Sequence, residues 1–461
     1  MTCAKTLVLH AAAHTIGANE PPPQLAGARR LIAGLLAASA AAFLAAPVLA
    51  QQLAASTDPQ AQAPAPLEPG VARWSNRPRF QFGDVLRLDV HARVQTDVRL
   101  RDDTEDPEEP LPFRDRVSVP KRRVGVEGVL FNRVEFQAER ELRDDTNPWR
   151  DVYADVRLHR SFRVRAGQFK VPFSLEQLTS AYNLDFVTRA SIVANLAPGR
   201  DIGIMVHGRV GNQVLKYEVG AFRFGNGIGL PSATATDLPE LSIGAGRTIA
   251  ARVTIAPLRD GKSRGSKDLE FGAAVVRNDL PEGRFGLPGH LAMGDTFFQR
   301  MFVNGSRTRL GLSGQWDAGR ARVTGELIRA ADTRLGQAVD GSDLSDLVSE
   351  GWYVSAVWAV AKARAKHHRG SRLGDVDVAV RLDRLLFGSA NQADEPFLNP
   401  RADRVATIGN QSLTFGATWS PNTWVKVQAN TTRERLVDPL QLLSIGAIPL
   451  WSTMLRVQVA M

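Results

Sequence analysis

Arginine is the charged side chain whose placement in this sequence is most regular. Arg87, Arg93 and Arg99 stand at odd positions of the stretch LRLDVHARVQTDVRL, residues 86–100. A similar placement on the polar face of an alternating segment recurs further along the chain, at Arg123, Arg163, Arg165, Arg309, Arg320 and Arg322. A guanidinium group is always charged and can fork around the oxygens of a phosphate. Rows of such groups could therefore bind or guide anions.

Acidic residues occupy the same polar faces as these arginines. Asp89 and Asp97 alternate with the arginines of residues 86–100, and further carboxylates follow at Glu127, Glu135, Glu139, Asp151 and Asp155. Opposite charges on neighbouring strands stabilise strand pairing. The arginines could therefore act on passing anions or could pair with neighbouring acids, and the sequence leaves both interpretations open.

The stretch 86–100 has apolar or small residues at even positions and mostly charged residues at odd positions. This period of two predicts a β-strand with one apolar and one polar face. Similar segments recur as far as residues 453–461, and about sixteen can be counted. We therefore expect an all-β protein.

The links between these segments alternate in length. Short links, most of them containing Asn, Gly or Pro, occur at residues 131–133, 159–161, 211–213, 317–319 and 420–423, whereas long links occur at 169–202, 225–247, 279–305, 388–410 and 434–451. Tight turns at one end and long loops at the other are typical of transmembrane antiparallel barrels, which have an even number of strands. Residues 80–461 are therefore predicted to form such a β-barrel of about 16 strands, with short periplasmic turns and long external loops.

Closure of the barrel would assign the two faces of each strand. About sixteen strands enclose a lumen too wide for side chains to fill, so the charged faces can line a water-filled pore while the apolar faces contact lipid. The alternative is a soluble β-sandwich or propeller with the apolar faces in a core. A propeller should show a repeat of roughly forty residues, and the sequence shows none.

The N-terminal part of the chain has a different composition. Arg29 and Arg30 precede an apolar stretch that ends in small residues at Ala50, which predicts a secretory signal peptide with a long leader over residues 1–50. A membrane-spanning helix is the alternative. Residues 51–79 are rich in Gln, Ala and Pro and are expected to form a flexible linker. The only cysteine, Cys3, lies in the leader, so we expect neither a disulfide framework nor a thiolate site.

The link at residues 169–202 is the third long loop of the expected barrel. It is long and rather apolar for an exposed loop, and loops of this length within a compact fold are usually functional. We expect it to fold into the lumen, to bury its apolar residues against the inner wall and to narrow the pore.

Three blocks in and beside this loop resemble a known family. RAGQFKVPFSLEQLTS (165–180), NLDFV (183–187) and LAPGRDIGIMVHGRV (196–210) are similar to the phosphate-selective porins O and P. The resemblance implies a bacterial outer-membrane porin, a sixteen-stranded and trimeric channel in which a loop reaches into the pore and basic residues guide anions such as phosphate. Lys170, Arg189 and Arg200 match the family blocks. The chain ends in Met461, where such barrels usually end in an aromatic residue.

The partners expected from this interpretation are inorganic anions, with phosphate as the permeant, outer-membrane lipid and lipopolysaccharide, and two further copies in a homotrimer. No enzymatic activity, cofactor or metal is expected, because the chain lacks Gly-x-Ser-x-Gly and His-Glu-x-x-His motifs and His367-His368 have no ligand partners at useful spacing. No long Lys/Arg run suggests nucleic acid. Two alternatives stay open: a weakly selective general porin and a non-conducting structural or adhesion barrel.

Overall fold

Alternating segments of the chain form long antiparallel strands. The computed structural model describes residues 72–74, 77–102, 116–143, 148–224, 246–258, 267–362, 374–390, 399–437 and 450–461, all within one compact unit, Leu67–Met461. The expected signal peptide at residues 1–50 lies outside the described residues, as does most of the expected linker. Among the described residues, no helix is long and apolar enough to cross a membrane.

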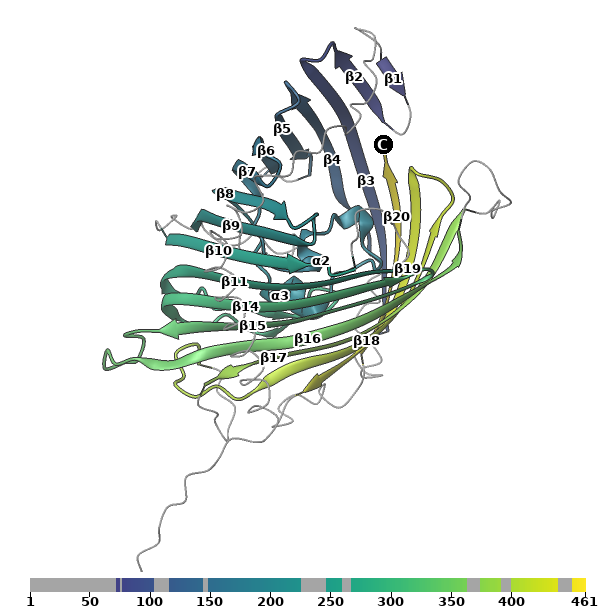
Figure 1. Ribbon diagram of the computed structural model, residues 1–461. Helices are drawn as coiled ribbons and strands as arrows, with labels where there is room; N and C mark the ends of the chain where they lie inside the picture. The colour runs from purple at the N-terminus through teal and green to yellow at the C-terminus, as the bar shows by residue number, and fades with distance from the viewer. Residues whose placement is uncertain are drawn as a thin grey trace, which may run out of the picture. The chain divides into compact units, whose positions relative to one another are not determined.

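Sixteen strands pair in chain order to form a closed antiparallel barrel (Figure 1). They are β3 (Leu86–Asp102), β4 (Arg116–Leu130), β5 (Val134–Glu141), β6 (Trp149–His159), β7 (Phe162–Lys170), β8 (Arg200–Val210), β9 (Leu215–Phe224), β10 (Gly246–Ile255), β11 (Lys267–Gly283), β14 (Val303–Ala318), β15 (Ala321–Arg334), β16 (Leu344–Ala361), β17 (Asp375–Ser389), β18 (Ile408–Ser420), β19 (Val425–Val437) and β20 (Leu450–Ala460). The ring closes where β20 pairs with β3, from Ala460 opposite Arg93 to Trp451 opposite Asp102. The predicted fold class is confirmed.

Two short strands precede the barrel and correct the predicted end of the linker at residue 79. β1 (Ala72–Trp74) pairs with β2 (Pro78–Phe82), and β2 pairs with β3 from Arg79 opposite Asp89 to Phe82 opposite Leu86. β2 thus extends the edge of β3 beyond the point where the C-terminus meets it, since Met461 exchanges backbone hydrogen bonds with Ala92. Strand structure therefore begins several residues earlier than the alternation suggested.

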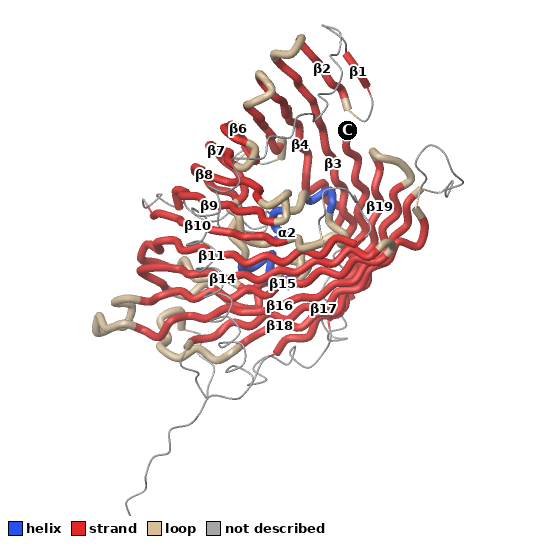
Figure 2. Tube along the Cα trace, viewed as in Figure 1, coloured by secondary structure: helices blue, strands red, loops and turns tan. Residues whose placement is uncertain are grey.

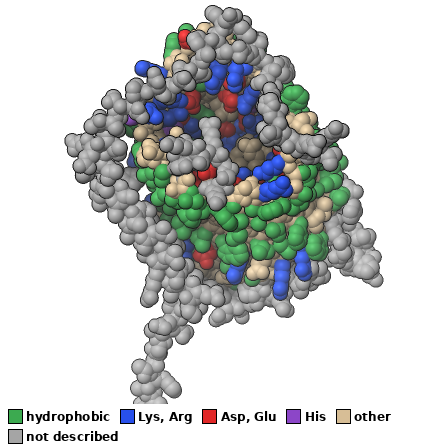
Figure 3. Space-filling view, turned by 45° about the vertical axis from the view of Figure 1, so that its right-hand side comes forward, with side chains coloured by type: hydrophobic (Ala, Val, Ile, Leu, Met, Phe, Trp, Pro, Cys, Tyr) green, Lys and Arg blue, Asp and Glu red, His purple; other side chains and the backbone are tan. Residues whose placement is uncertain are grey.

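The two faces of the strands separate as the alternation predicted. On β20, Leu455, Val457 and Val459 are exposed on the outside, whereas Arg456 and Gln458 between them are buried inside. Figure 3 shows a band of hydrophobic side chains on the outer wall below a hollow in which basic and acidic side chains gather. An apolar outer band of this kind is what a barrel needs to contact lipid.

The loop between β7 and β8, residues 171–199, lies inside the barrel, as predicted. We call it the inserted loop; it contains α2 (Leu175–Leu178), the 3-10 turn η2 (Ala181–Asn183) and α3 (Ser191–Leu196). Figure 2 shows these short helices within the ring of strands. α3 packs against β15, β16 and β17, so the loop lies against one side of the wall and leaves the other side open.

A second segment also folds inward, which the sequence did not predict. Residues 284–302, called the second inserted segment, contain the short strands β12 (Gly289–His290) and β13 (Thr296–Phe298). Phe298 stacks on Phe387 of β17 with ring centroids 4.7 Å apart. Asn195 of α3 donates to the backbone oxygen of His290 at 3.1 Å. The two inserted elements therefore support each other.

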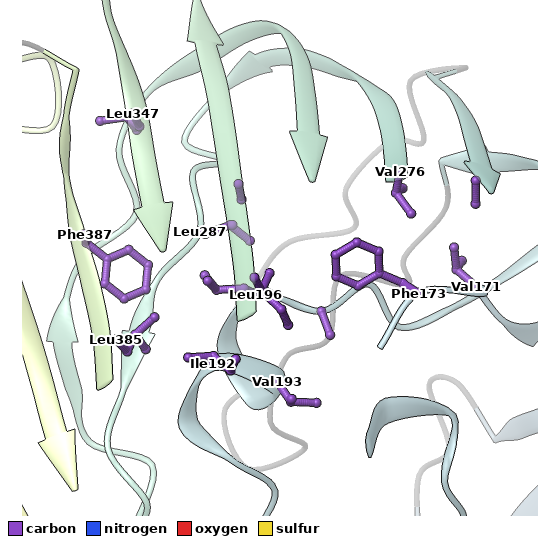
Figure 4. Close-up of a cluster of buried hydrophobic side chains, with 14 of the residues drawn as sticks. Val171, Phe173, Ile192, Val193, Leu196, Val276, Leu287, Leu347, Leu385 and Phe387 are labelled. Atoms are coloured by element: carbon purple, nitrogen blue, oxygen red, sulfur yellow. The ribbon is translucent and has the colours of Figure 1, made fainter. Parts of the chain in front are cut away.

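Apolar side chains of both inserted elements form one buried cluster with the wall. Ile192 and Leu196 of α3 lie near Leu385 and Phe387 of β17, and Phe173 of the inserted loop belongs to the same cluster (Figure 4). Burying a large apolar side chain contributes about 1.5–3 kcal/mol. The apolar character of the loop, which is unusual for an exposed segment, is explained by this packing.

Candidate functional site

The lumen contains a cavity of about 670 Å³ between the inserted loop and the wall, lined mainly by strands β3–β8 and also by residues of β9 and β17–β20. We call it the central cavity. Among the described residues, ten basic and six acidic side chains line it, so basic groups outnumber acidic groups by four. Residues 291–294 of the second inserted segment also reach its edge. A path through the barrel at this level must pass these side chains.

The N-terminal end of α2 is fixed by one buried carboxylate of the wall. Glu326 of β15 accepts hydrogen bonds from Ser174 Oγ at 3.1 Å, from the backbone nitrogen of Leu175 at 2.9 Å and from that of Glu176 at 2.8 Å. Tyr353 of β16 donates its hydroxyl to the same carboxylate at 3.0 Å. Four donors on one acid satisfy the helix N–H groups that have no partner within the helix.

Arginines of the wall hold the rest of the inserted loop through its backbone oxygens. Arg381 of β17 donates to Thr188 at 3.0 Å, Arg456 of β20 donates to Val187 at 2.6 Å, and Arg309 of β14 donates to Leu196 at 2.7 Å. Arg381 and Arg456 are also paired with Asp383 and Asp97. We call Glu326, Arg309, Arg381 and Arg456 the clamp residues.

Three cations of the central cavity have no carboxylate partner within ion-pair distance among the described residues. Lys170, at the end of β7, donates to the backbone oxygens of Leu178 at 3.2 Å and Thr179 at 3.0 Å. Arg189 of the loop donates to the backbone oxygen of Thr179 at 3.1 Å. Lys121 of β4 lines the cavity without a hydrogen bond to any described residue. These three basic groups of the cavity are therefore not neutralised by a carboxylate of the described residues.

Other predicted cations line the same cavity but are paired. Arg123 contacts Glu141 at 2.8 Å and Glu139 at 3.1 Å, and Arg93 lies 3.5 Å from Glu139. Arg165 contacts Asp155 at 2.8 Å, and Arg200 contacts Asp151 at 2.7 Å. Arg99 also belongs to the lining. The interpretation that polar-face arginines pair with neighbouring acids thus applies even to arginines that face the cavity.

Five of the predicted cations do not line the central cavity. Arg309 is buried and holds the inserted loop, Arg163 bridges Glu135 and Asp155, and Arg322 pairs with Asp317. Arg87 is exposed at the start of β3 beside Asp89, and Arg320 is exposed in the turn before β15. Alternation alone could not separate these positions, because it gives the face of a residue and not its height along the barrel.

The sequence reasoning missed three basic residues of the cavity, Arg381, Arg456 and Lys121, and the reason is clearest for Lys121. The predicted strand began at Arg123, whereas β4 begins at Arg116 and runs through Pro120. The register between β3 and β4 shifts at this point, between Gln95 and Asp97, and a proline within a strand is tolerated at such a bulge. The motif Lys121-Arg122-Arg123 next to a proline was the available signal.

Glu176 is an acid of the inserted loop whose ionisation is perturbed. Burial raises the pKa of its carboxyl from 4.5 to about 7, against the opposing effects of Arg381 and Arg189 and with a further rise from Glu326. One of its oxygens lies 3.7 Å from Arg381, and the other accepts a hydrogen bond from the backbone nitrogen of Ala190 at 2.9 Å. Its charge therefore changes near neutral pH, close to Arg189 of the cavity. Among the described residues, no group of acids and histidines could hold a metal ion.

Comparisons with known proteins agree with this architecture. A family model described as phosphate-selective porin O and P matches residues 88–435. A loop L8 deletion mutant of OmpT, an outer membrane protein of Vibrio cholerae, aligns with a TM-score of 0.51 at 10% sequence identity, covering 82% of this chain and 100% of that chain. The outer membrane channel DcaP of Acinetobacter baumannii aligns with a TM-score of 0.50 at 10% identity, covering 82% and 98%. At such identities the structures share the fold alone. None of the curated proteins matches the chain.

Proposed function

This chain belongs to the phosphate-selective porin O and P family, and from that premise we propose that it is a passive diffusion channel biased toward anions, with phosphate or a related oxyanion as the preferred permeant. The family and the fold are those of outer-membrane channel proteins. The proposal adds the sign of the selectivity and the class of the permeant.

The observation that carries the proposal is the group formed by Lys121, Lys170 and Arg189. All three side chains line the central cavity, and none has a carboxylate within ion-pair distance among the described residues. Lys170 also stands directly opposite Arg200 across β7 and β8. A selective channel must attract its ion strongly enough to admit it and weakly enough to release it. Cations contributed by β4, β7 and the loop would give a tetrahedral oxyanion several partners at once.

Block of chloride current by inorganic phosphate tests this function. The full barrel is reconstituted in planar bilayers in KCl, and phosphate is added while single-channel current is recorded. We expect a dose-dependent fall in chloride current in the wild-type channel and a weaker block in Lys121→Gln. A channel whose current is indifferent to phosphate would contradict the oxyanion preference and would favour the weakly selective general porin. A channel without measurable conductance would favour the structural or adhesion barrel.

The homotrimer implied by the family resemblance stays a prediction. Its measurement is the mass of the detergent-solubilised protein by light scattering, with the detergent contribution subtracted. The signal peptide is tested separately, by N-terminal sequencing of the mature protein, which we expect to begin after Ala50.

A further inference from the structure

The outer wall of the barrel carries arginines near the strand ends that lead into the long links. Arg223 of β9 and Arg247 of β10 stand directly opposite each other. Both are exposed, and they share the outer face with Ile249, whereas Thr248 next to Arg247 is buried inside. Arg277 of β11 is opposite Ile249 and is exposed on the same face. Three guanidinium groups are therefore close together on the outside of the barrel.

Within the described residues, this arrangement brings like charges together. Like charges directly opposite each other on neighbouring strands destabilise the pair. Within the described residues, none of these three guanidinium groups forms an ion pair or a side-chain hydrogen bond. Asp279 adds one negative charge beside the three cations, and its carboxylate accepts a hydrogen bond from the backbone nitrogen of Arg247 at 3.2 Å. An anion outside the barrel would remove the repulsion.

A second group of outward arginines lies across β17–β19. Arg384 and Arg435 flank Gln411 in one cross-strand row. Arg433, two residues before Arg435, lies over the ring of Trp451 at 5.8 Å from its centroid. Trp451 is itself exposed on the outer face. A tryptophan beside cations is typical of the level at which lipid headgroups begin. We call the six residues Arg223, Arg247, Arg277, Arg384, Arg433 and Arg435 the rim arginines.

The opposite end of the outer wall is different. Near the short turns, the exposed outward residues include Trp316, Trp358 and Trp419, at the ends of β14, β16 and β18. These large side chains are aromatic and uncharged. The rim arginines thus lie near the end with long loops. In outer-membrane barrels that end faces the external leaflet.

We propose that the rim arginines form a binding surface for the phosphate groups of a glycolipid in the external leaflet of the outer membrane. A guanidinium group can bind a phosphate through two parallel hydrogen bonds, and the pair is charge-assisted. A phosphorylated headgroup bridging Arg223 and Arg247 replaces like-charge repulsion with two attractive contacts. Lipid is the occupant that fits a charged row set directly above an apolar band.

Binding of a lipid A-type glycolipid to the detergent-solubilised full barrel tests the proposal. Native mass spectrometry would measure its dissociation constant for the wild type and for the triple variant Arg223→Gln, Arg247→Gln, Arg277→Gln. The matched control triple, Arg133→Gln, Arg160→Gln, Arg209→Gln, removes the same charge from exposed positions near the short turns. We expect roughly 100-fold weaker binding in the rim variant, because each arginine near an anionic headgroup contributes about a fivefold factor. We expect an unchanged constant in the control.

The lipid probe is compared with its dephosphorylated form and with inorganic phosphate. Equal binding by the rim variant and the wild type would overturn the proposal, as would an equal loss in the control triple. Displacement by inorganic phosphate at similar concentrations would assign the surface to free phosphate and overturn the lipid assignment. Loss of the oligomer in the rim variant would assign it to contacts between copies. Heat-dependent migration on gels confirms that each variant is a folded barrel.

Discussion

The two sides of the inner wall use the same residue type for different purposes. Along β14–β20, the clamp residues Glu326, Arg309, Arg381 and Arg456 are buried and bind the backbone of the inserted loop. Along β3–β8, basic side chains such as Lys121 line an open cavity. The two sides differ because the inserted loop packs against only one of them. There, the arginines of the wall donate hydrogen bonds to backbone oxygens of the loop. On the covered side, Arg309 is buried behind the loop, whereas Arg381 and Arg456 bind the backbone of the loop and also line the central cavity.

The clamp side should show the largest effect of a single change. Glu326→Ala leaves Ser174 Oγ and two backbone N–H groups of α2 without their acceptor, and Tyr353 loses its partner as well. We expect the free energy of unfolding to fall by about 2–4 kcal/mol and the single-channel conductance to rise and fluctuate as the loop loosens. Unfolding in detergent followed by circular dichroism, together with bilayer recording, measures both.

Glu135→Ala is the matched control for the clamp. Glu135 is a partly exposed acid of the open side, paired with Arg157 and Arg163. Its loss should cost less than about 1 kcal/mol, because exposed ion pairs contribute little. Equal destabilisation by the two variants would contradict the division of the wall into a clamp and a cavity lining.

Lys121→Gln should have the second largest effect, this time on selectivity. It removes a cavity charge that has no partner among the described residues, without removing a hydrogen bond from the inserted loop. A unit charge several ångströms from the ion path in a partly aqueous lumen should change the anion-to-cation permeability ratio by about fivefold. The exposed Arg87 provides the control, and Arg87→Gln should leave the ratio unchanged. A similar permeability ratio in both variants would show that Lys121 does not contribute to anion selectivity.

Much of the fold could be predicted from the sequence, whereas the division of the wall could not. The alternation along residues 86–100 predicted which face of a strand is polar and which is apolar. The alternating link lengths predicted that the strands close into a barrel. The apolar loop was expected inside the lumen and lies there, but Lys170 and Arg200, which were expected within it, belong to the ends of β7 and β8. The side of the wall against which the loop packs could not be predicted, because contacts such as that of Arg309 with Leu196 join residues more than one hundred positions apart. The second inserted segment also looked like an ordinary long link.

A smaller effect should appear in the pH dependence of selectivity. The pKa of Glu176 is raised to about 7 by burial, so the folded protein holds its proton above the pH at which the unfolded chain loses it. The free energy of unfolding should fall as the pH rises between about 4.5 and about 7. Around pH 7, where the carboxyl of the folded protein ionises, the new negative charge beside Arg189 and Arg381 should weaken anion preference. Reversal potentials measured from about pH 5 to about pH 8 should slope in the wild type and be flatter in Glu176→Gln. Equal slopes would exclude Glu176 as the source.

The smallest effect should come from removing both members of one ion pair that lines the cavity. Asp151→Asn combined with Arg200→Gln removes an ion pair without changing the net charge. We expect a permeability ratio within about twofold of the wild type, since paired charges largely cancel at a distance. A fall in the permeability ratio as large as that in Lys121→Gln would mean that ion-paired arginines also contribute to selectivity.

The reversal potential of the wild-type channel tests the central claim most directly. The full barrel is placed in a planar bilayer under a roughly tenfold KCl gradient, and the potential at zero current is recorded. Unpaired cations in the central cavity should make chloride more permeant than potassium, so the potential should have the sign set by the chloride gradient. A potential with the sign set by the potassium gradient would contradict the account.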